Sequence, residues 1–268
     1  MSLDCLNNSN PHLKAELANG ILTLAIDRPE AKNALYTDLY IAIEQALYQA
    51  DASNDVRIVV LRGANNDFSA GNDMQDFAAS LKKQISPAGD GAPFLLLKSA
   101  AKFSKPLIVG VKGVAIGIGV TLLLHADFVY TDTSAVFQIP FVSLGLSPEG
   151  AASKLLQQRA GYLLAADLLM SARKFNAETA LDAKLVTQIV DEPYAQAAQM
   201  AEHLNQLPLA SLKQSKALMK ADKDDIVAWI DHEAEIFMQR VKSPEMIEAL
   251  TAFKEKRKPN FKQFPKFP

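Results

Sequence analysis

Two nearly uninterrupted apolar runs, Val56–Leu61 and Leu107–Val111, constrain the fold of this chain more than any other feature. Strands of this kind are buried on both faces, as in sheets that are covered by helices on each side. Each run leads into a turn that contains glycine and other small residues, at Asp67–Met74 and Gly110–Val120, and then into a segment with helical character. This alternation predicts an α/β architecture.

The flanking segments extend the α/β pattern and add a helical region. Asn19-Gly20 is a strong hairpin signal between Leu13–Ala18 and Ile21–Asp27. Thr37 is expected to cap a helix whose apolar residues recur at helical spacing. From about residue 150 the pattern becomes mostly helical. Further strands are expected at Phe128–Tyr130 and Val136–Ile139, and helices at Met74–Lys83, Phe94–Phe103, Ala151–Arg159, Tyr162–Met170, Ala177–Ala183, Tyr194–Gln206, Leu209–Lys220 and Asp225–Lys242.

Composition excludes several functional classes. Lys and Arg number 28 against 30 Asp and Glu, and the net charge of −2 gives no general affinity for nucleic acid. No apolar run reaches the ~20 residues needed to cross a bilayer, so we expect no membrane insertion. The first residues lack the basic and apolar regions of a signal peptide, and we expect a cytoplasmic protein. Cys5 is the single cysteine, which excludes an internal disulfide and a cysteine metal cluster.

The two glycine-containing turns are candidate sites for a developing negative charge. Backbone N–H groups at such turns can point toward an anion, and two turns would supply the pair of donors that an oxyanion hole needs. Simpler explanations exist for each. Asp67–Met74 can be an ordinary loop in which Asp73 caps the following helix, and the glycines of Gly110–Val120 can serve packing. The second turn matches neither the Walker nor the dinucleotide-binding pattern.

Glu149 is the candidate acid/base group. Ser147 can cap the next helix, Pro148 suits its first position, and Glu149 suits its positive end, which is a complete structural explanation. The long apolar approach to Glu149 favours another interpretation, a partly desolvated carboxylate with a raised pKa.

The other polar residues give weaker signals. The four histidines show no metal-binding spacing, and no serine lies in a nucleophile elbow. His125 lies among leucines and is expected in the core. The basic segment from Phe253 to Lys258 is either a solvated end of the chain or a binding element, because runs of charge usually stay in water.

Four segments, taken in order, resemble the crotonase (enoyl-CoA hydratase/isomerase) superfamily. Asp27–Ala34 is similar to the family's N-terminal motif, and Ala252–Pro259 to its C-terminal signature. Phe68–Asp73 and Gly113–Gly119 are similar to its two oxyanion-hole segments. Each motif alone is weak, but the four in this order are specific and cover nearly the whole chain.

The resemblance implies a fold, an assembly and a substrate. The fold would be a crotonase-type α/β spiral of ββα units over residues 1–200. Residues 201–268 would form a C-terminal helical region that completes the fold and builds a homotrimer, often paired into a hexamer. The substrate would be an acyl-CoA thioester, with coenzyme A as part of the substrate and no metal or redox cofactor.

Carried over residue by residue, the resemblance also implies a site. The main-chain N–H groups of Ala70 and Ile118 would form the oxyanion hole, and Glu149 would transfer protons. Phe253 and Lys256 would contact the CoA, often that of a neighbouring subunit. The substrate and its CoA part would contact Ala31, Lys32, Ser69, Ala70, Gly71, Asn72, Asp73, Met74, Gly117, Phe141, Phe253 and Lys256.

Two departures from the family pattern select the reaction. Hydratases of the family use two glutamates to position and split water, whereas the matching residues here are Thr121 and Phe141. Glu149 lies eight residues beyond Phe141, where peroxisomal-type monofunctional Δ3,Δ2-enoyl-CoA isomerases carry their only base. The resemblance therefore implies movement of a double bond from C3 to C2 of a 3-enoyl-CoA.

Three alternatives to the isomerase stay open at this point. The chain could hydrate an enoyl-CoA, or catalyse another thioester reaction of the family such as hydrolysis or dehalogenation. Asp73 and Asp76 are the only nearby candidates for a nucleophile or water-activating group. It could also be a non-catalytic acyl-CoA-binding member.

Overall fold

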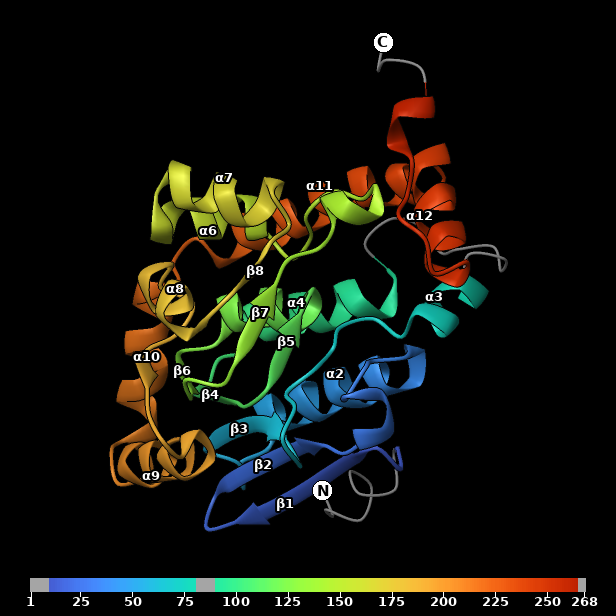
Figure 1. Cartoon of the computed structure of the whole chain (residues 1–268). Helices are drawn as coiled ribbons and strands as arrows, with labels where there is room; N and C mark the ends of the chain where they lie inside the picture. The colour runs from blue at the N-terminus through green and yellow to red at the C-terminus, as the bar shows by residue number, and fades with distance from the viewer. Residues whose placement is uncertain (1–9, 81–89, 265–268) are drawn as a thin grey trace.

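The computed structural model describes residues 10–80 and 90–264 and contains two sheets flanked by helices (Figure 1). In the larger sheet the strand order is β1 (Leu13–Ala18), β2 (Ile21–Ile26), β3 (Ile58–Gly63), β4 (Leu107–Val111), β6 (Phe128–Thr131) and β9 (Gln188–Ile189). β1 and β2 pair antiparallel, and every later pair is parallel. The smaller sheet consists of β5 (Val114–Ile116), β7 (Val136–Gln138) and β8 (Lys174–Phe175). The predicted α/β architecture is confirmed.

Helices on both faces explain why the two apolar runs are continuous. Val59 and Leu61 of β3 pack into the core that includes α2 (Thr37–Ala52) and α4 (Ala92–Lys102). Ile58 and Val60 point to the opposite face, which α9 (Pro193–Asn205) covers. Successive residues of a strand face opposite sides of the sheet, so both sets must be apolar when both sides are buried.

The remaining helices are those outside the two layers that cover β3. They are α3 (Met74–Ser80), α5 (Ile118–Thr121), α6 (Ala152–Ala160), α7 (Tyr162–Met170), α8 (Ala177–Asp182), α10 (Leu209–Met219), α11 (Lys223–Val241) and α12 (Pro244–Lys254), with short 3-10 turns η1 (Pro29–Ala31), η2 (Leu122–His125), η3 (Val142–Leu144) and η4 (Phe261–Gln263). Sequence analysis missed α12, although its start signals are present. Ser243 caps it by accepting a hydrogen bond from Met246 N at 3.2 Å, and Pro244 occupies its first turn.

Some predicted segments lie outside the described residues. These are Cys5, the end of the helix predicted over Met74–Lys83, and the first half of the connection Ser86–Pro93. The division of the chain at residue 200 stays a prediction. None of the helices in residues 10–80 and 90–264 is long and apolar enough to cross a membrane.

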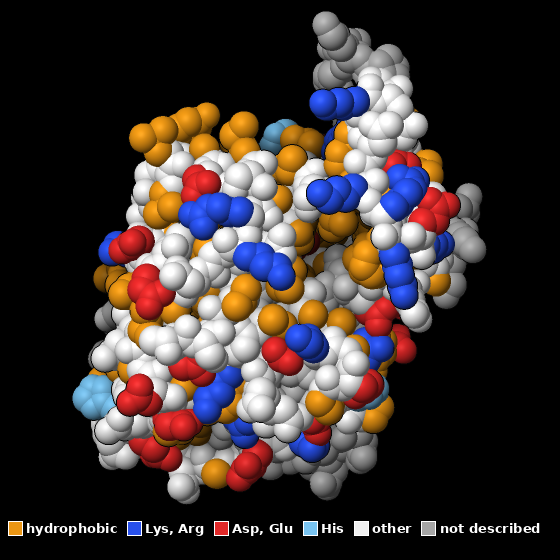
Figure 2. All heavy atoms as spheres, in the orientation of Figure 1, with side chains coloured by type: hydrophobic (Ala, Val, Ile, Leu, Met, Phe, Trp, Pro, Cys, Tyr) orange, Lys and Arg blue, Asp and Glu red, His pale blue; other side chains and the backbone are white. Residues whose placement is uncertain are grey.

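Helix α7 carries exposed apolar side chains. Tyr162, Leu163 and Met170 are 65%, 84% and 67% exposed, and Figure 2 shows hydrophobic side chains gathered along this upper edge of the molecule. The homotrimer or hexamer implied by the sequence stays a prediction.

Candidate active site

A cavity of about 540 Å³ lies between helices α2, α3, α4 and α11. Phe94 of α4 and Phe237 of α11 contribute to its apolar wall. Asn72, Asp73 and Glu149 reach it from loops. A largely apolar cavity with a few polar groups is the usual form of a site for a small organic ligand.

Glu149 is the buried acid of this cavity. The residue is 2% exposed, and its Oε1 accepts a hydrogen bond from Thr121 Oγ1 at 3.1 Å. Burial raises the pKa of Glu149 to about 8, the Thr121 hydrogen bond opposes this rise, and the negative charge of Glu233 adds to it. A carboxyl group with such a pKa can take up a proton and return it near neutral pH.

The predicted position of Glu149 in the first turn of a helix is wrong. Helix α6 begins only at Ala152, and Gly150 and Ala151 before it both have positive φ values, 73° and 59°. Two consecutive left-handed residues cannot belong to a right-handed helix, so the helix starts after them. Ser147 therefore caps nothing, and its buried Oγ has no hydrogen-bond partner among the residues that the structure describes.

His125 holds the turn that carries Glu149. Its Nε2 lies 2.9 Å from the carbonyl oxygen of Gly150. Burial lowers the pKa of His125 to about 3, so the ring is neutral, and Nε2 carries the proton that it donates to this carbonyl. The predicted core position of His125 is confirmed.

The turn from Ser69 to Asp73 leaves one backbone donor free. The Ala70 N–H donates to the carbonyl oxygen of Lys32 at 2.9 Å, so it is already paired. The Gly71 N–H donates to Ser69 Oγ and the Asp73 N–H to the carbonyl oxygen of Leu35. The Asn72 N–H has no acceptor within the described part of the chain. The geometry therefore favours Asn72 over the predicted Ala70 as a donor to a ligand.

A second free donor lies at the start of α5. Gly117 N donates to the carbonyl oxygen of Gln138 at 2.9 Å, whereas the Ile118 N–H has no acceptor among residues 10–80 and 90–264. The first N–H groups of a helix have no partner within it, which leaves this donor available. The predicted role of Ile118 is compatible with this geometry.

A bridge between Ser69 and Ala115 holds the two donor segments side by side. Ser69 N donates to Val114 O, and Ile116 N donates to Ser69 O, both at 2.9 Å. The approach is close enough that a Cβ atom on Gly119 would lie 2.8 Å from the carbonyl oxygen of Ser69. Glycine is required there by packing, as one of the alternatives in the sequence analysis held.

Tyr40 is a site residue that sequence analysis missed. Its hydroxyl donates a short hydrogen bond to Asn72 Oδ1, and both residues line the cavity. Burial, followed by the charges of Glu149, Asp76 and Asp73, raises the pKa of Tyr40, which keeps the hydroxyl protonated. Tyr40 lies beside the apolar residues of α2, and no local pattern separates it from a core tyrosine.

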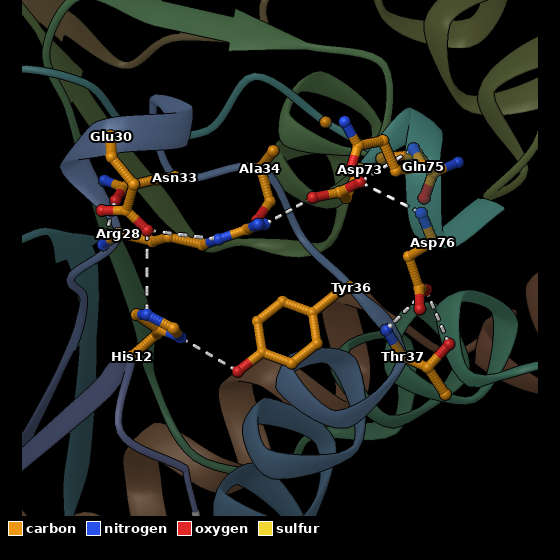
Figure 3. A network of polar contacts seen from close by, with 12 residues as sticks. His12, Arg28, Glu30, Asn33, Ala34, Tyr36, Thr37, Asp73, Gln75 and Asp76 are labelled. Carbon is orange, nitrogen blue, oxygen red and sulfur yellow. Dashed lines mark hydrogen bonds and ion pairs between the residues drawn. The ribbon is translucent and has the colours of Figure 1, made fainter. Parts of the chain in front are cut away.

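Figure 3 shows the polar network around Asp73 and Asp76, both of which line the cavity. Asp73 Oδ1 accepts from the N–H groups of Gln75 and Asp76, which caps α3 as one alternative proposed. Asp73 Oδ2 pairs with Arg28 Nη1 at 2.8 Å.

Asp76, rather than Thr37, supplies the capping group for α2. Its Oδ2 accepts from Thr37 N at 2.9 Å and from Thr37 Oγ1 at 2.8 Å. Thr37 is the first helical residue and Tyr36 the N-cap, so the predicted capping role of Thr37 is wrong. A carboxylate from another helix takes that role instead.

Several residues predicted to bind CoA lie apart from this cavity. Phe141 packs behind its wall, with its ring 6.1 Å from that of Phe237. On the C-terminal side, Phe253 is 65% exposed and Lys256 is exposed, and neither lines the cavity. The other predicted residues outside the lining are Ala31, Lys32, Ser69, Ala70, Gly71, Met74, Gly117 and Ile118. Of these, Ile118 carries the second free donor, and Ser69–Gly71 and Gly117 are chain neighbours of the two donors. Their roles stay predictions.

The described residues contain no cluster of three or more His, Cys, Asp or Glu side chains that could hold a metal ion.

Comparison with known proteins identifies the family. The model of the enoyl-CoA hydratase/isomerase family matches residues 16–265. The chain is 32% identical to 1,2-epoxyphenylacetyl-CoA isomerase of Escherichia coli, covering 92% of this chain and 97% of that protein. It is 34% identical to enoyl-CoA delta isomerase 2 of Rattus norvegicus, covering 87% of this chain and 61% of that longer protein. A crystal structure of an Acinetobacter baumannii protein described as an enoyl-CoA hydratase/isomerase is 65% identical, with a TM-score of 0.89 over 91% of this chain and 99% of that one. This chain therefore belongs to the crotonase (enoyl-CoA hydratase/isomerase) family and has its fold.

Proposed function

We propose that this chain is a Δ3,Δ2-enoyl-CoA isomerase in which Glu149 is the only acid/base group. The observation that carries the proposal is the burial of one carboxyl group, with a pKa of about 8, in the wall of an apolar cavity. Migration of a double bond needs a single group that removes and returns a proton, and Glu149 meets that requirement.

The reaction begins at C2 of the 3-enoyl-CoA. The Glu149 carboxylate takes a proton from C2, the C–H electrons form a C1–C2 double bond, and the thioester oxygen becomes negative. The N–H groups of Asn72 and Ile118 are the proposed donors to that oxygen, because each is free in this structure. The protonated Glu149 then delivers the proton to C4. The C3–C4 double bond has moved to C2–C3, and the carboxylate is regenerated.

Hydration is the less favoured reaction because one carboxyl group cannot easily do the work of two. The two glutamate positions of family hydratases hold Thr121 and Phe141. Thr121 donates its hydroxyl to Glu149, and Phe141 packs against Phe237, so neither offers a base to a water molecule. The family includes both reactions, and direct comparison of the two rates is therefore the decisive measurement.

The test uses purified protein with 3-enoyl-CoAs of graded chain length and, separately, with 2-trans-enoyl-CoAs. We expect conversion of the 3-enoyl to the 2-trans-enoyl thioester, with hydration of the 2-trans-enoyl substrate slower by at least about 10², the usual contribution of a general base. Comparable rates of hydration and isomerisation would contradict the proposal. Binding of acyl-CoA without turnover of any substrate would favour a non-catalytic member of the family.

A further inference from the structure

A buried carboxyl group from the C-terminal helical region lies behind the turn that carries Glu149. Glu233 of α11 is 5% exposed. Its Oε1 accepts hydrogen bonds from Ser153 N at 3.0 Å and Ser153 Oγ at 2.5 Å, at the start of α6. Trp229, one helical turn before Glu233, donates its indole N–H to the same Ser153 Oγ at 3.0 Å. Two side chains of α11 therefore bind the beginning of α6 through Ser153.

The turn that Glu233 holds is one that needs support. Ala151 has a φ of 59°, a conformation that costs a residue with a side chain roughly 1 kcal/mol or more. The N–H groups of Ala151 and Ala152 also act as donors that lower the pKa of the Glu233 carboxyl group. Glu149 lies two residues before Ala151, so any movement of this turn displaces the candidate base.

Glu233 also carries an unpaired buried oxygen. Its Oε2 has no hydrogen-bond partner among the residues that the structure describes. A buried carboxyl oxygen that accepts no hydrogen bond lowers the stability of the folded protein. The cost is explained if the group acts on its neighbour, because negative charge near Glu149 favours the protonated form of that base.

We propose that Glu233 is a positioning residue for Glu149: it ties the turn of the base to α11 and places a second negative charge behind it. The kinetic consequences rest on the proposed isomerase function, whereas the coupling between the two carboxyl groups does not. The C-terminal helical region thereby contributes directly to the site, in addition to completing the fold.

The groups that face Glu149 come from three elements. Thr121 of α5 donates to it, Tyr40 of α2 lies close enough to feel its charge, and Glu233 of α11 adds like charge. His125, which contacts the same turn, is neutral because burial lowers its pKa to about 3. Burial raises the pKa of Glu233 as well, in spite of the Ser153, Ala151 and Ala152 donors, and the charge of Glu233 is among the causes that raise the pKa of Glu149.

Two substitutions separate the charge of Glu233 from its grip on the turn. Glu233→Gln removes the charge and keeps an oxygen that accepts from Ser153, whereas Glu233→Met removes both and leaves no buried amide unpaired. In both variants we expect the midpoint of the pH–rate profile, measured as kcat/KM, to fall by roughly 0.5–1 pH unit. We expect kcat at the plateau to stay within about 3-fold of wild type in Glu233→Gln and to fall about 10-fold in Glu233→Met, since a small displacement of a base is costly.

The matched control is Glu235→Gln, which makes the same charge change at an exposed position on α11 and should alter neither quantity. An unchanged midpoint in folded Glu233→Gln or Glu233→Met would overturn the proposal, because a purely structural residue would lower the rate without moving the midpoint. If one variant fails to fold, the other still gives the midpoint.

A measurement that needs no turnover distinguishes failure of this proposal from failure of the proposed function. Carboxyl-labelled glutamate would give an NMR titration in which the Glu149 signal is assigned by its loss in Glu149→Gln. We expect that signal to titrate at lower pH when Glu233 is replaced. A shifted titration in a protein without isomerase activity would retain the coupling and reject the isomerase. An unshifted titration in an active isomerase would reject the coupling alone.

Discussion

Two carboxyl groups that line one cavity, Asp73 and Glu149, have pKa values shifted in opposite directions. Burial acts to raise the pKa of Asp73, but the N–H groups of Asp76 and Gln75 and the Arg28 guanidinium outweigh it, and its pKa is lowered. Burial also raises the pKa of Glu149, where Thr121 is the one donor within the described part of the chain and does not offset it. The comparison teaches that burial alone does not set the charge of an acid in this site. Glu149 is also more deeply buried than Asp73, with 2% of the residue exposed against 16% of the Asp73 side chain, so the depth of burial and the donors to the carboxylate together set its charge.

Because their pKa values differ, the two carboxyl groups have different roles in the cavity. Asp73 stays ionised near neutral pH and serves as a helix cap and ion-pair partner. Glu149 is mostly protonated at pH 7 in the unliganded protein and becomes a base as the pH approaches 8. Activity that depends on the Glu149 carboxylate should therefore rise with pH up to about 8.

Replacing each carboxyl group with its amide should reveal the largest difference in activity between Glu149 and Asp73. Glu149→Gln keeps the shape and the acceptor for Thr121 but cannot transfer a proton, so we expect kcat to fall by at least about 10². Asp73→Asn keeps an oxygen that can cap α3, and we expect kcat to fall by less than about 10-fold. The measurement is steady-state turnover of a 3-enoyl-CoA, with circular dichroism to check folding. Near-wild-type turnover by folded Glu149→Gln would remove Glu149 from the mechanism.

The same two variants should change stability in opposite directions. Because folding raises the pKa of Glu149 from 4.5 to about 8, the folded protein holds this proton more tightly, and wild type loses stability as the pH rises between those values. Glu149→Gln should therefore be more stable than wild type above pH 8, by roughly 5 kcal/mol if it replaces the protonated acid without strain, and equal to it below pH 4.5.

Asp73 has the reverse linkage. Its pKa is lowered by folding, so its contribution is present above the unfolded value of 3.8 and is lost as the pH falls through the folded value. Asp73→Asn should be less stable than wild type at pH 7 and should approach it at pH 3. Urea unfolding at pH 3, 7 and 9 measures all of these differences. A Glu149→Gln protein no more stable than wild type at pH 9 would show that the base is not desolvated.

Sequence reasoning predicted the scaffold well because the scaffold follows from local pattern. The two apolar runs became β3 and β4, and the helices predicted after residue 150 were confirmed to within a few residues. It also singled out Glu149 by the apolar segment before it. These features depend on the chain near each residue, where hydrophobic periodicity and turn residues carry the information.

The details of the site could not be predicted because distant residues decide them. The sequence analysis named the Ala70 N–H as a donor by resemblance and could not foresee that the Lys32 carbonyl accepts from it, which leaves the Asn72 N–H as the free donor of this turn among the described residues. Asp76 replaces Thr37 as the capping group of α2 across 39 residues of chain. Likewise the start of α6 depends on the left-handed Ala151, a conformation that an alanine does not signal.

Removing the Thr121 hydrogen bond should raise the pKa of Glu149 further and increase its difference from the pKa of Asp73. Thr121→Val keeps the shape and deletes the hydrogen bond that lowers the pKa of Glu149, so the pH–rate midpoint should rise by roughly 0.5–1 unit. Activity at pH 7 should then fall about 3- to 10-fold and recover at higher pH. Thr121→Ser, which keeps the hydroxyl, is the matched control and should retain the wild-type midpoint. A Thr121→Val profile that is lowered equally at every pH would point to packing instead.

Weakening the donors around Asp73 should have the smallest effect and should leave the base alone. Arg28 pairs with Asp73 Oδ2 and donates to the carbonyl oxygen of Ala34 at 3.0 Å, and its side chain is 20% exposed. Arg28→Met should lower stability at pH 7 by about 1 kcal/mol, as expected for a partly exposed ion pair with one further hydrogen bond. Part of this loss should disappear at pH 3, where Asp73 is protonated in the unfolded chain and its pairing contributes less.

Arg28→Lys, which keeps the charge, should lose less stability at pH 7. Neither variant should move the pH–rate midpoint, because the pKa values of Asp73 and Glu149 depend on separate donors. A midpoint shift in Arg28→Met would show that the two carboxyl groups titrate together.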